Sequence, residues 1–184
     1  MTPLVQLVTE VLSFFSLFAL AGSVFLLVLI LFGKGTSWHS FFVSRAAILS
    51  FIVVFFGTAS SLFYSEFAHF TPCTLCWWQR VFLYPQVILF AIVIWKRYKN
   101  AWRFSLPLSV AGALVAFYQV YLQFGGALSV LCSSEDVVSC SKRYFLAYGF
   151  ITIPTMAAIA FVLLILFQIF DWQGRKEEIN RPLS

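Results

Sequence analysis

Charged side chains are scarce in this sequence: Asp, Glu, Lys and Arg make up 10% of its 184 residues, whereas hydrophobic residues make up 61%. A water-soluble domain could hardly hide so much apolar surface, so that class of protein is excluded. The chain also lacks an internal repeat, a phosphate-binding loop and a heptad array. Solenoid, P-loop and coiled-coil architectures are therefore not expected.

Five long stretches contain almost no charge. Uncharged apolar runs of about 18 residues or more are typical of membrane-spanning helices. The runs are Val11–Phe32, Ala46–Phe67, Trp77–Trp95, Phe104–Phe124 and Phe150–Phe170. Only Glu66, near an end, and Arg80 carry charge inside them. The sequence therefore predicts an all-α integral membrane protein.

The first run could be taken for a signal peptide, but it is longer than the apolar part of one, and no Ala-x-Ala-like cleavage site follows it. We interpret it as an uncleaved helix, which gives a four-helix transmembrane bundle with one additional N-terminal transmembrane helix. Residues 1–45 would form this helix and a cytoplasmic loop. Residues 46–170 would form the core with two outer-face cysteine pairs, and 171–184 a cytoplasmic tail.

The basic residues alternate between the two sides of the predicted bundle. Nine of the twelve Lys and Arg residues fall in the first loop, the third loop and the C-terminal tail. Segments with an excess of Lys and Arg stay in the cytoplasm. The N-terminus, the second loop and the fourth loop should then lie outside. The six Trp residues fall in or beside the predicted interfaces, as an aromatic belt requires.

All four cysteines fall on the predicted outer side. Cys73 and Cys76 belong to the second loop, and Cys132 and Cys140 to the fourth. Disulfides persist outside the cytoplasm. Ser, Glu and Asp between Cys132 and Cys140 favour a flexible, water-exposed hairpin. A disulfide could bridge this gap, either as a reactive pair or as a structural staple.

Residues 71–80, TPCTLCWWQR, open the third run. A helix that starts at Pro72 or Cys73 puts Cys73, Cys76 and Arg80 on one face, at i, i+3 and i+7. The free N–H groups of the first turn and the guanidinium both favour a thiolate, so we interpret the pair as a reactive dithiol. An arginine inside a span is costly and marks a candidate functional site, although it could also snorkel to the interface.

Three other polar residues lie near the predicted outer side of the membrane. Gln119 and Gln123 share a helix face at i, i+4 and could hydrogen-bond the carbonyl of a lipid-soluble ligand, or only a neighbouring helix. His69 could carry protons for the dithiol, or could be an interfacial histidine without catalytic use.

The order of these parts resembles the DsbB family of membrane thiol oxidases. The matching pieces are Cys73 and Cys76 with Arg80 at the head of a span, the later pair Cys132 and Cys140, and the segment 149–154, GFITIP, that opens the last span. Three features differ from the usual pattern. The first helix is additional, and Val115 stands where relatives place a histidine near the quinone. The fourth loop is much shorter than in the best-known enterobacterial member and is closer to that of Gram-positive-type relatives.

The resemblance implies a protein-disulfide-generating thiol:quinone oxidoreductase. Its partner would be a DsbA-like thioredoxin-fold protein, its cofactor a quinone (ubiquinone or menaquinone) without a metal, and its location the bacterial inner membrane. Cys132 would form the mixed disulfide with the partner, and Cys140 would exchange with Cys73. Cys76 would face the quinone as a thiolate, and the quinone would be bound by Arg80 and Gln119.

Three alternatives stay open. A vitamin K epoxide reductase-like protein also has four helices and four cysteines, but there the loop pair precedes the membrane pair. Four cysteines could instead hold zinc, or could form two purely structural disulfides.

The charge pattern generates a prediction of topology. Cysteine labelling at Lys99 and at Ser133 should show the two positions accessible from opposite sides of the membrane, with Ser133 outside. Accessibility of both positions from the same side would refute this topology.

Overall fold

The computed structural model describes residues 2–33, 35–98, 100–126 and 140–180, without the side chains of 177–180. Within these residues the elements are the helices α1 (Pro3–Phe32), α2 (Ser37–Leu62), α3 (Thr74–Lys96), α4 (Trp102–Gln123) and α5 (Ile153–Asn180), and the π-helical turn η1 (Phe63–Phe67) that continues α2. All five helices are long and apolar enough to cross a membrane. The predicted class, an all-α integral membrane protein, is confirmed.

Several helices are longer than the apolar runs that predict them. α1 starts at Pro3 because Thr2 caps it: the Thr2 hydroxyl accepts a hydrogen bond from the Val5 N–H at 3.4 Å. α2 starts at Ser37, where the Thr36 hydroxyl accepts from the His39 N–H at 3.2 Å. α5 continues beyond the apolar run to Asn180. These helices therefore continue beyond the apolar runs, into residues that are more polar.

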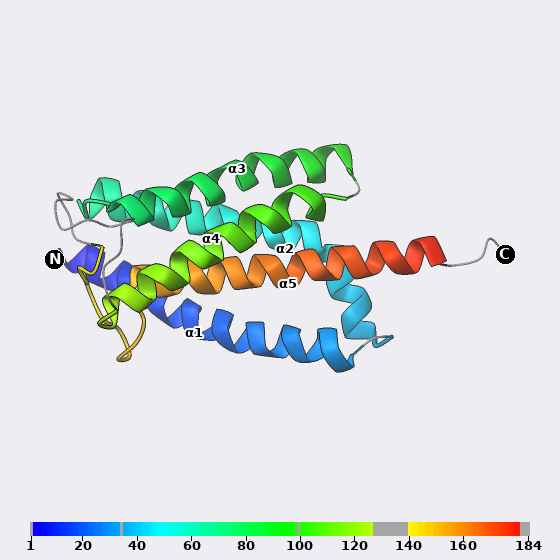
Figure 1. The fold of residues 1–184 in the computed structure, drawn as a ribbon, viewed down its shortest axis with the longest axis horizontal. Helices are drawn as coiled ribbons and strands as arrows, with labels where there is room; N and C mark the ends of the chain where they lie inside the picture. The colour runs from blue at the N-terminus through cyan, green and yellow to red at the C-terminus, as the bar shows by residue number, and fades with distance from the viewer. Residues whose placement is uncertain (1, 34, 99, 127–139, 181–184) are drawn as a thin grey trace.

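The helices run up and down, so the two termini lie at opposite ends of the bundle (Figure 1). The N-terminus, the α2–α3 connection and the segment before α5 lie at one end, which we call the cysteine end. The α1–α2 and α3–α4 connections and the C-terminus lie at the other. Successive helices alternate in direction, so all the segments with described cysteines meet at the same end.

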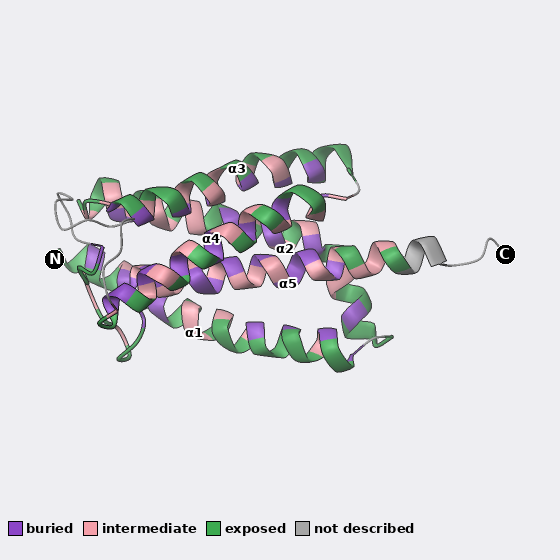
Figure 2. Cartoon of the chain, in the orientation of Figure 1, coloured by how far each residue is buried: buried purple, intermediate pink, exposed green. Residues whose placement is uncertain are grey.

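α5 is the central helix, and half of the residues in its most apolar 18-residue stretch are buried (Figure 2). A core cluster joins it to α2, α3 and α4 through Val54, Leu83, Phe90, Ala113 and Phe161. α1 lies outside this core: most of its surface is exposed, and it packs mainly against α5. The arrangement is the predicted four-helix bundle with one additional N-terminal helix.

Polar side chains link the helices inside the bundle. The Gln86 side-chain oxygen accepts hydrogen bonds from the hydroxyls of Ser105 at 2.7 Å and Ser109 at 3.1 Å, which joins α3 to α4. The Gln168 amide donates to the Ser50 hydroxyl at 3.0 Å, which joins α5 to α2. Lipid offers no hydrogen-bond partners, so buried polar groups of a spanning helix must find theirs in a neighbouring helix.

The α4–α5 contact generates a prediction of stability. A Cβ added at Gly112 would overlap the ring of Phe161, which is fully buried and cannot move aside. We expect Gly112→Ala to lower the free energy of unfolding by about 1–3 kcal/mol through overpacking, despite the better helix propensity of Ala. Thermal unfolding in detergent measures the effect. Gly22→Ala on α1 is the matched control, because nothing lies within 4 Å of its added Cβ. Equal stability of the two variants would contradict the prediction.

Candidate active site

The two cysteines of the Cys-x-x-Cys segment lie at the start of α3. Cys73 is the N-cap residue, with extended backbone angles (φ −78°, ψ 173°), and Cys76 lies in the first turn. Both cysteines are free, and their sulfur atoms lie 3.2 Å apart. A disulfide needs a separation of about 2 Å, so a small movement is enough to join them. The predicted helix start and the pairing of the two thiols follow from this one turn.

Burial and hydrogen bonding make the two thiols unequal. The hydrogen bond with Cys76 Sγ, and then burial, raise the pKa of the Cys73 thiol above its ordinary value. Of the two thiols, Cys73 therefore holds its proton more strongly. The Cys76 sulfur, next to the N–H groups of the first turn, is the better place for negative charge.

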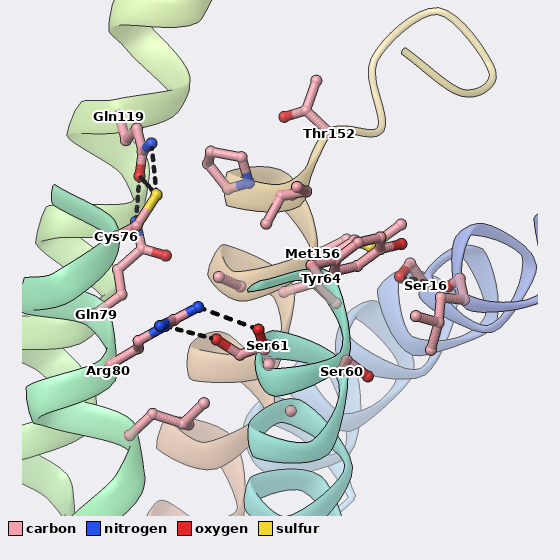
Figure 3. Close-up of a pocket in the computed structure, with 18 of the residues that line it drawn as sticks. Ser16, Ser60, Ser61, Tyr64, Cys76, Gln79, Arg80, Gln119, Thr152 and Met156 are labelled. Atoms are coloured by element: carbon pink, nitrogen blue, oxygen red, sulfur yellow. Dashed lines mark hydrogen bonds between the residues drawn. The ribbon is translucent and has the colours of Figure 1, made fainter. Parts of the chain in front are cut away.

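Gln119 of α4 touches both sulfurs. Its Nε2 lies 3.2 Å from Cys73 Sγ and 3.3 Å from Cys76 Sγ. Its side-chain oxygen accepts a hydrogen bond from Gln79 Nε2 at 2.6 Å. This bond directs the amide nitrogen of Gln119 toward the sulfurs (Figure 3). Gln119 and Gln79 are both buried, so the amide pair can stabilise a thiolate without competition from water.

Arg80 is held inside the bundle by α2. Its Nε donates to the Ser61 hydroxyl at 3.0 Å, and a terminal nitrogen donates to the Ser61 carbonyl at 3.1 Å. The guanidinium also lies 5.1 Å from the centre of the Trp77 ring. Its described hydrogen bonds therefore run across to α2, and the charge faces the same space as Cys76 (Figure 3).

A cavity of about 280 Å³ opens beside these groups. Cys73, Cys76, Gln79, Arg80 and Gln119 line its polar end. The remainder is mostly apolar and is built by α2, α5 and α1. This combination of an apolar cavity and a few convergent polar groups is typical of a small-molecule site.

Gln123, one turn beyond Gln119, also lines the cavity. Its amide donates to the Lys142 carbonyl at 3.0 Å, whereas its buried side-chain oxygen has no hydrogen-bond partner among the described residues. The two glutamines thus share a face, as the sequence predicts, but only Gln119 contacts the thiols. His69 is exposed, and it is not among the residues that line the cavity.

Cys140 differs from the expectation. The sequence predicts a water-exposed loop cysteine, but Cys140 is only 1% exposed and packs in one cluster with Cys73, Leu75 and Leu122. Cys140 is disulfide-bonded. Apolar neighbours from α3 and α4 enclose it, which explains its burial. Cys132 lies outside the described residues.

Aromatic contacts hold the segment after Cys140 over the start of α3. The rings of Phe70 and Tyr144 stack with their centres 4.3 Å apart. The Tyr144 hydroxyl donates to the Thr71 carbonyl at 2.8 Å. Burial, and then the neighbouring cysteines, raise the pKa of Tyr144, so this donor keeps its proton. These contacts bring two segments that are far apart in the sequence to the same dithiol.

Sequence reasoning missed Gln79 and Ser61. Gln79 is a polar residue in an apolar span, next to Arg80, and this position could have suggested it. Nothing in the sequence marks Ser61, because its contact with Arg80 depends on which face of α2 meets α3.

Val115, noted for the histidine it replaces, packs against the cluster of Cys73 and Cys140. The zinc alternative gains no support from the part of the chain that the structure describes, where no three His, Cys, Asp or Glu residues gather.

Comparisons with known proteins decide the family. The family model for "Disulfide bond formation protein DsbB" matches residues 43–170. The chain belongs to the DsbB family. Membership implies a disulfide-forming oxidoreductase and separates the chain from the vitamin K epoxide reductase group.

Curated relatives of the DsbB family cover most of this chain. The SPbeta prophage-derived disulfide bond formation protein B of Bacillus subtilis (strain 168) is 42% identical over 123 residues, which is 67% of this chain and 82% of that protein. Disulfide bond formation protein C of the same organism is 34% identical and covers 70% of this chain and 93% of that protein. A probable disulfide formation protein of Chlamydia caviae is 34% identical, and the match covers 66% of this chain and 87% of that protein. No solved structure matches the chain significantly.

The contacts of Gln119 generate a prediction about thiol reactivity. In the reduced protein, Gln119→Leu removes the donor that faces both sulfurs, so the thiolate loses stabilisation. We expect alkylation of Cys76 near neutral pH to slow roughly tenfold, since a hydrogen bond to a charged group contributes about 1.5–3 kcal/mol. Alkylation followed by peptide mapping measures this rate. Gln86→Leu is the matched control: it removes a buried, hydrogen-bonded glutamine of α3 that does not touch the thiols. Wild-type alkylation in Gln119→Leu would rule out the assigned contact.

Proposed function

We propose that this protein reoxidises the dithiol of a DsbA-like thioredoxin-fold protein outside the cytoplasm and passes the electrons to a membrane quinone. The observation that carries the proposal is the meeting of Cys73, Cys76 and Cys140 in one place beside the cavity that holds Arg80. Family membership supports the disulfide chemistry, and the cavity supports a lipid-soluble oxidant. The cysteine end would face the outside of the bacterial inner membrane.

The first half of the reaction is thiol–disulfide exchange. A partner thiolate attacks Cys132 of a Cys132–Cys140 disulfide and releases the Cys140 thiolate. Cys140 attacks Cys73 of a Cys73–Cys76 disulfide and leaves Cys76 as a thiolate. The second partner thiol then displaces Cys132, and the partner departs oxidised. Burial of Cys140 in the same cluster as Cys73 supports this transfer, because the attacking and receiving residues lie in one part of the site.

The second half restores both pairs. Cys132 attacks Cys140, which re-forms the loop disulfide and leaves Cys73 and Cys76 as a dithiol. The two cysteines close to a disulfide and give up two electrons and two protons. A quinone held at the polar end of the cavity would accept both electrons and both protons and would leave as the quinol. Net, one partner dithiol and one quinone become one partner disulfide and one quinol.

The residues at the polar end of the cavity would support this second half. Ser61 holds the guanidinium of Arg80 at the cavity. From there the guanidinium would favour the Cys76 thiolate and the charge that develops on a reduced quinone oxygen. Gln119 would donate to the sulfurs. Removal of water from this space strengthens both interactions.

The relay is tested with cysteine variants. Cys73→Ser or Cys76→Ser should abolish quinone reduction by the reduced partner. A Cys132→Ser/Cys140→Ser double variant should fail to oxidise the partner, but its Cys73–Cys76 dithiol should still react with quinone after reduction by dithiothreitol. The measurements are quinol formation and the thiol content of the partner. Full oxidation of the partner by the double variant would contradict the two-pair relay.

A further inference from the structure

The far wall of the cavity comes from a segment outside the family match. The lining runs from Cys76 and Arg80 at one end to residues of α1 at the other: Leu12, Phe15, Ser16 and Ala19. Figure 3 shows Ser16 across the cavity from Arg80. α1 ends at Phe32, whereas the family match begins at residue 43. A helix that lies outside the family match therefore closes the candidate site.

α1 is fixed to the bundle on both sides of this wall. Near its start, the Tyr64 hydroxyl donates to the Thr9 hydroxyl at 3.3 Å. Near its end, Leu26 and Ile30 belong to the same buried cluster as Phe170. Since both ends are attached, the middle of α1 stays against the cavity.

The inward stripe of α1 has small residues at the cavity. Its buried residues recur every three or four positions, apart from one gap: Val5, Thr9, Ser13, Ser23, Leu26 and Ile30. Ser16 and Ala19 fill the gap with the same spacing, and so lie on the same face. They are only half-buried, because they face the cavity instead of a packed side chain. Their small size leaves space that a larger side chain would fill.

Small residues of α2 and α5 also leave space between the polar end of the cavity and α1. On α2 the lining includes Gly57, Ser60 and Ser61, and on α5 it includes Ala157 and Ala160. The cavity therefore extends from the polar groups of α3 and α4, past small residues of α2 and α5, to α1. An amphipathic molecule would put its polar head at Arg80 and its apolar part toward α1.

We propose that α1 is the tail-binding wall of the quinone site, and that Ser16 and Ala19 contact the lipid side chain of the quinone. This inference rests on the proposed function and adds a role for the additional helix in selecting quinones by their side chain. It gives α1 an effect on quinone affinity but none on exchange with the partner dithiol.

The test fills the wall and varies the side chain of the quinone. The probes are a benzoquinone that carries a decyl chain and the same benzoquinone without the chain, reduced by the partner dithiol. Ala19→Phe should raise the KM for the decyl probe roughly tenfold or more, because hydrophobic pockets discriminate about this strongly against one misplaced group. The KM for the chainless probe and the KM for the partner should not change.

Two further variants and a binding measurement complete the design. Ala21→Phe, on the exposed face of the same helix, is the matched control and should leave both quinone KM values unchanged. Arg80→Met should raise the KM for both probes. The decyl probe should raise the Tm of wild type and Ala21→Phe, but not of Ala19→Phe, since a ligand stabilises only the protein that binds it. Retained turnover of the chainless probe shows that Ala19→Phe is folded, and Ala19→Leu replaces it if turnover is lost.

The outcomes separate the two proposals. If wild type reduces both probes and Ala19→Phe behaves like Ala21→Phe, the role of α1 is wrong and the proposed function stands. If wild type reduces neither probe with the partner dithiol, the proposed function fails and the role of α1 fails with it.

Discussion

The amide of Gln119 is the interaction on which the site depends. It is 2% exposed and lies on α4, so it must find its hydrogen-bond partners inside the bundle or carry the cost of an unpaired polar group. Its partners are the sulfurs of Cys73 and Cys76 and the amide of Gln79, all at the start of α3. The packing of α4 against α3 therefore sets the surroundings of the dithiol. A change in how these two helices pack would change the stability of the thiolate as well.

The cysteine end gathers its groups because the connections there are constrained. The π-helical turn η1 ends α2, and the chain reverses at His69, which has a positive φ of 53°. Such local departures from α-helical geometry are frequent near functional sites. The stacked rings of Phe70 and Tyr144 then join this turn to the segment that follows Cys140. Two connections, each anchored to the other, thus cover one end of the bundle and place Cys140 beside Cys73.

The cavity exists because α1 packs tightly at two places and loosely between them. Association of helices in a membrane relies on close packing and on hydrogen bonds, since lipid tails are as apolar as the helix surface. The Tyr64–Thr9 hydrogen bond and the cluster around Phe170 supply these contacts at the two ends. Small residues in the middle of α1 leave the intervening space unfilled. The additional helix is therefore part of the surroundings of the dithiol and not a separate anchor.

The class of the protein, its five long helices and the cysteine pair at the start of α3 could all be predicted from the sequence. These features are local: length and apolarity mark a spanning helix, and the spacing of Cys73 and Cys76 puts both in one turn. The contact of Gln119, and not of Gln123, with the sulfurs could not be predicted in this way, nor could the bonds from Arg80 to Ser61 or the burial of Cys140. The reason is physical. The helices are apolar on the faces toward lipid as well as toward the core, so their sequences do not reveal which faces meet. The partners of each polar side chain, and the wall that α1 gives to the cavity, follow from that packing alone.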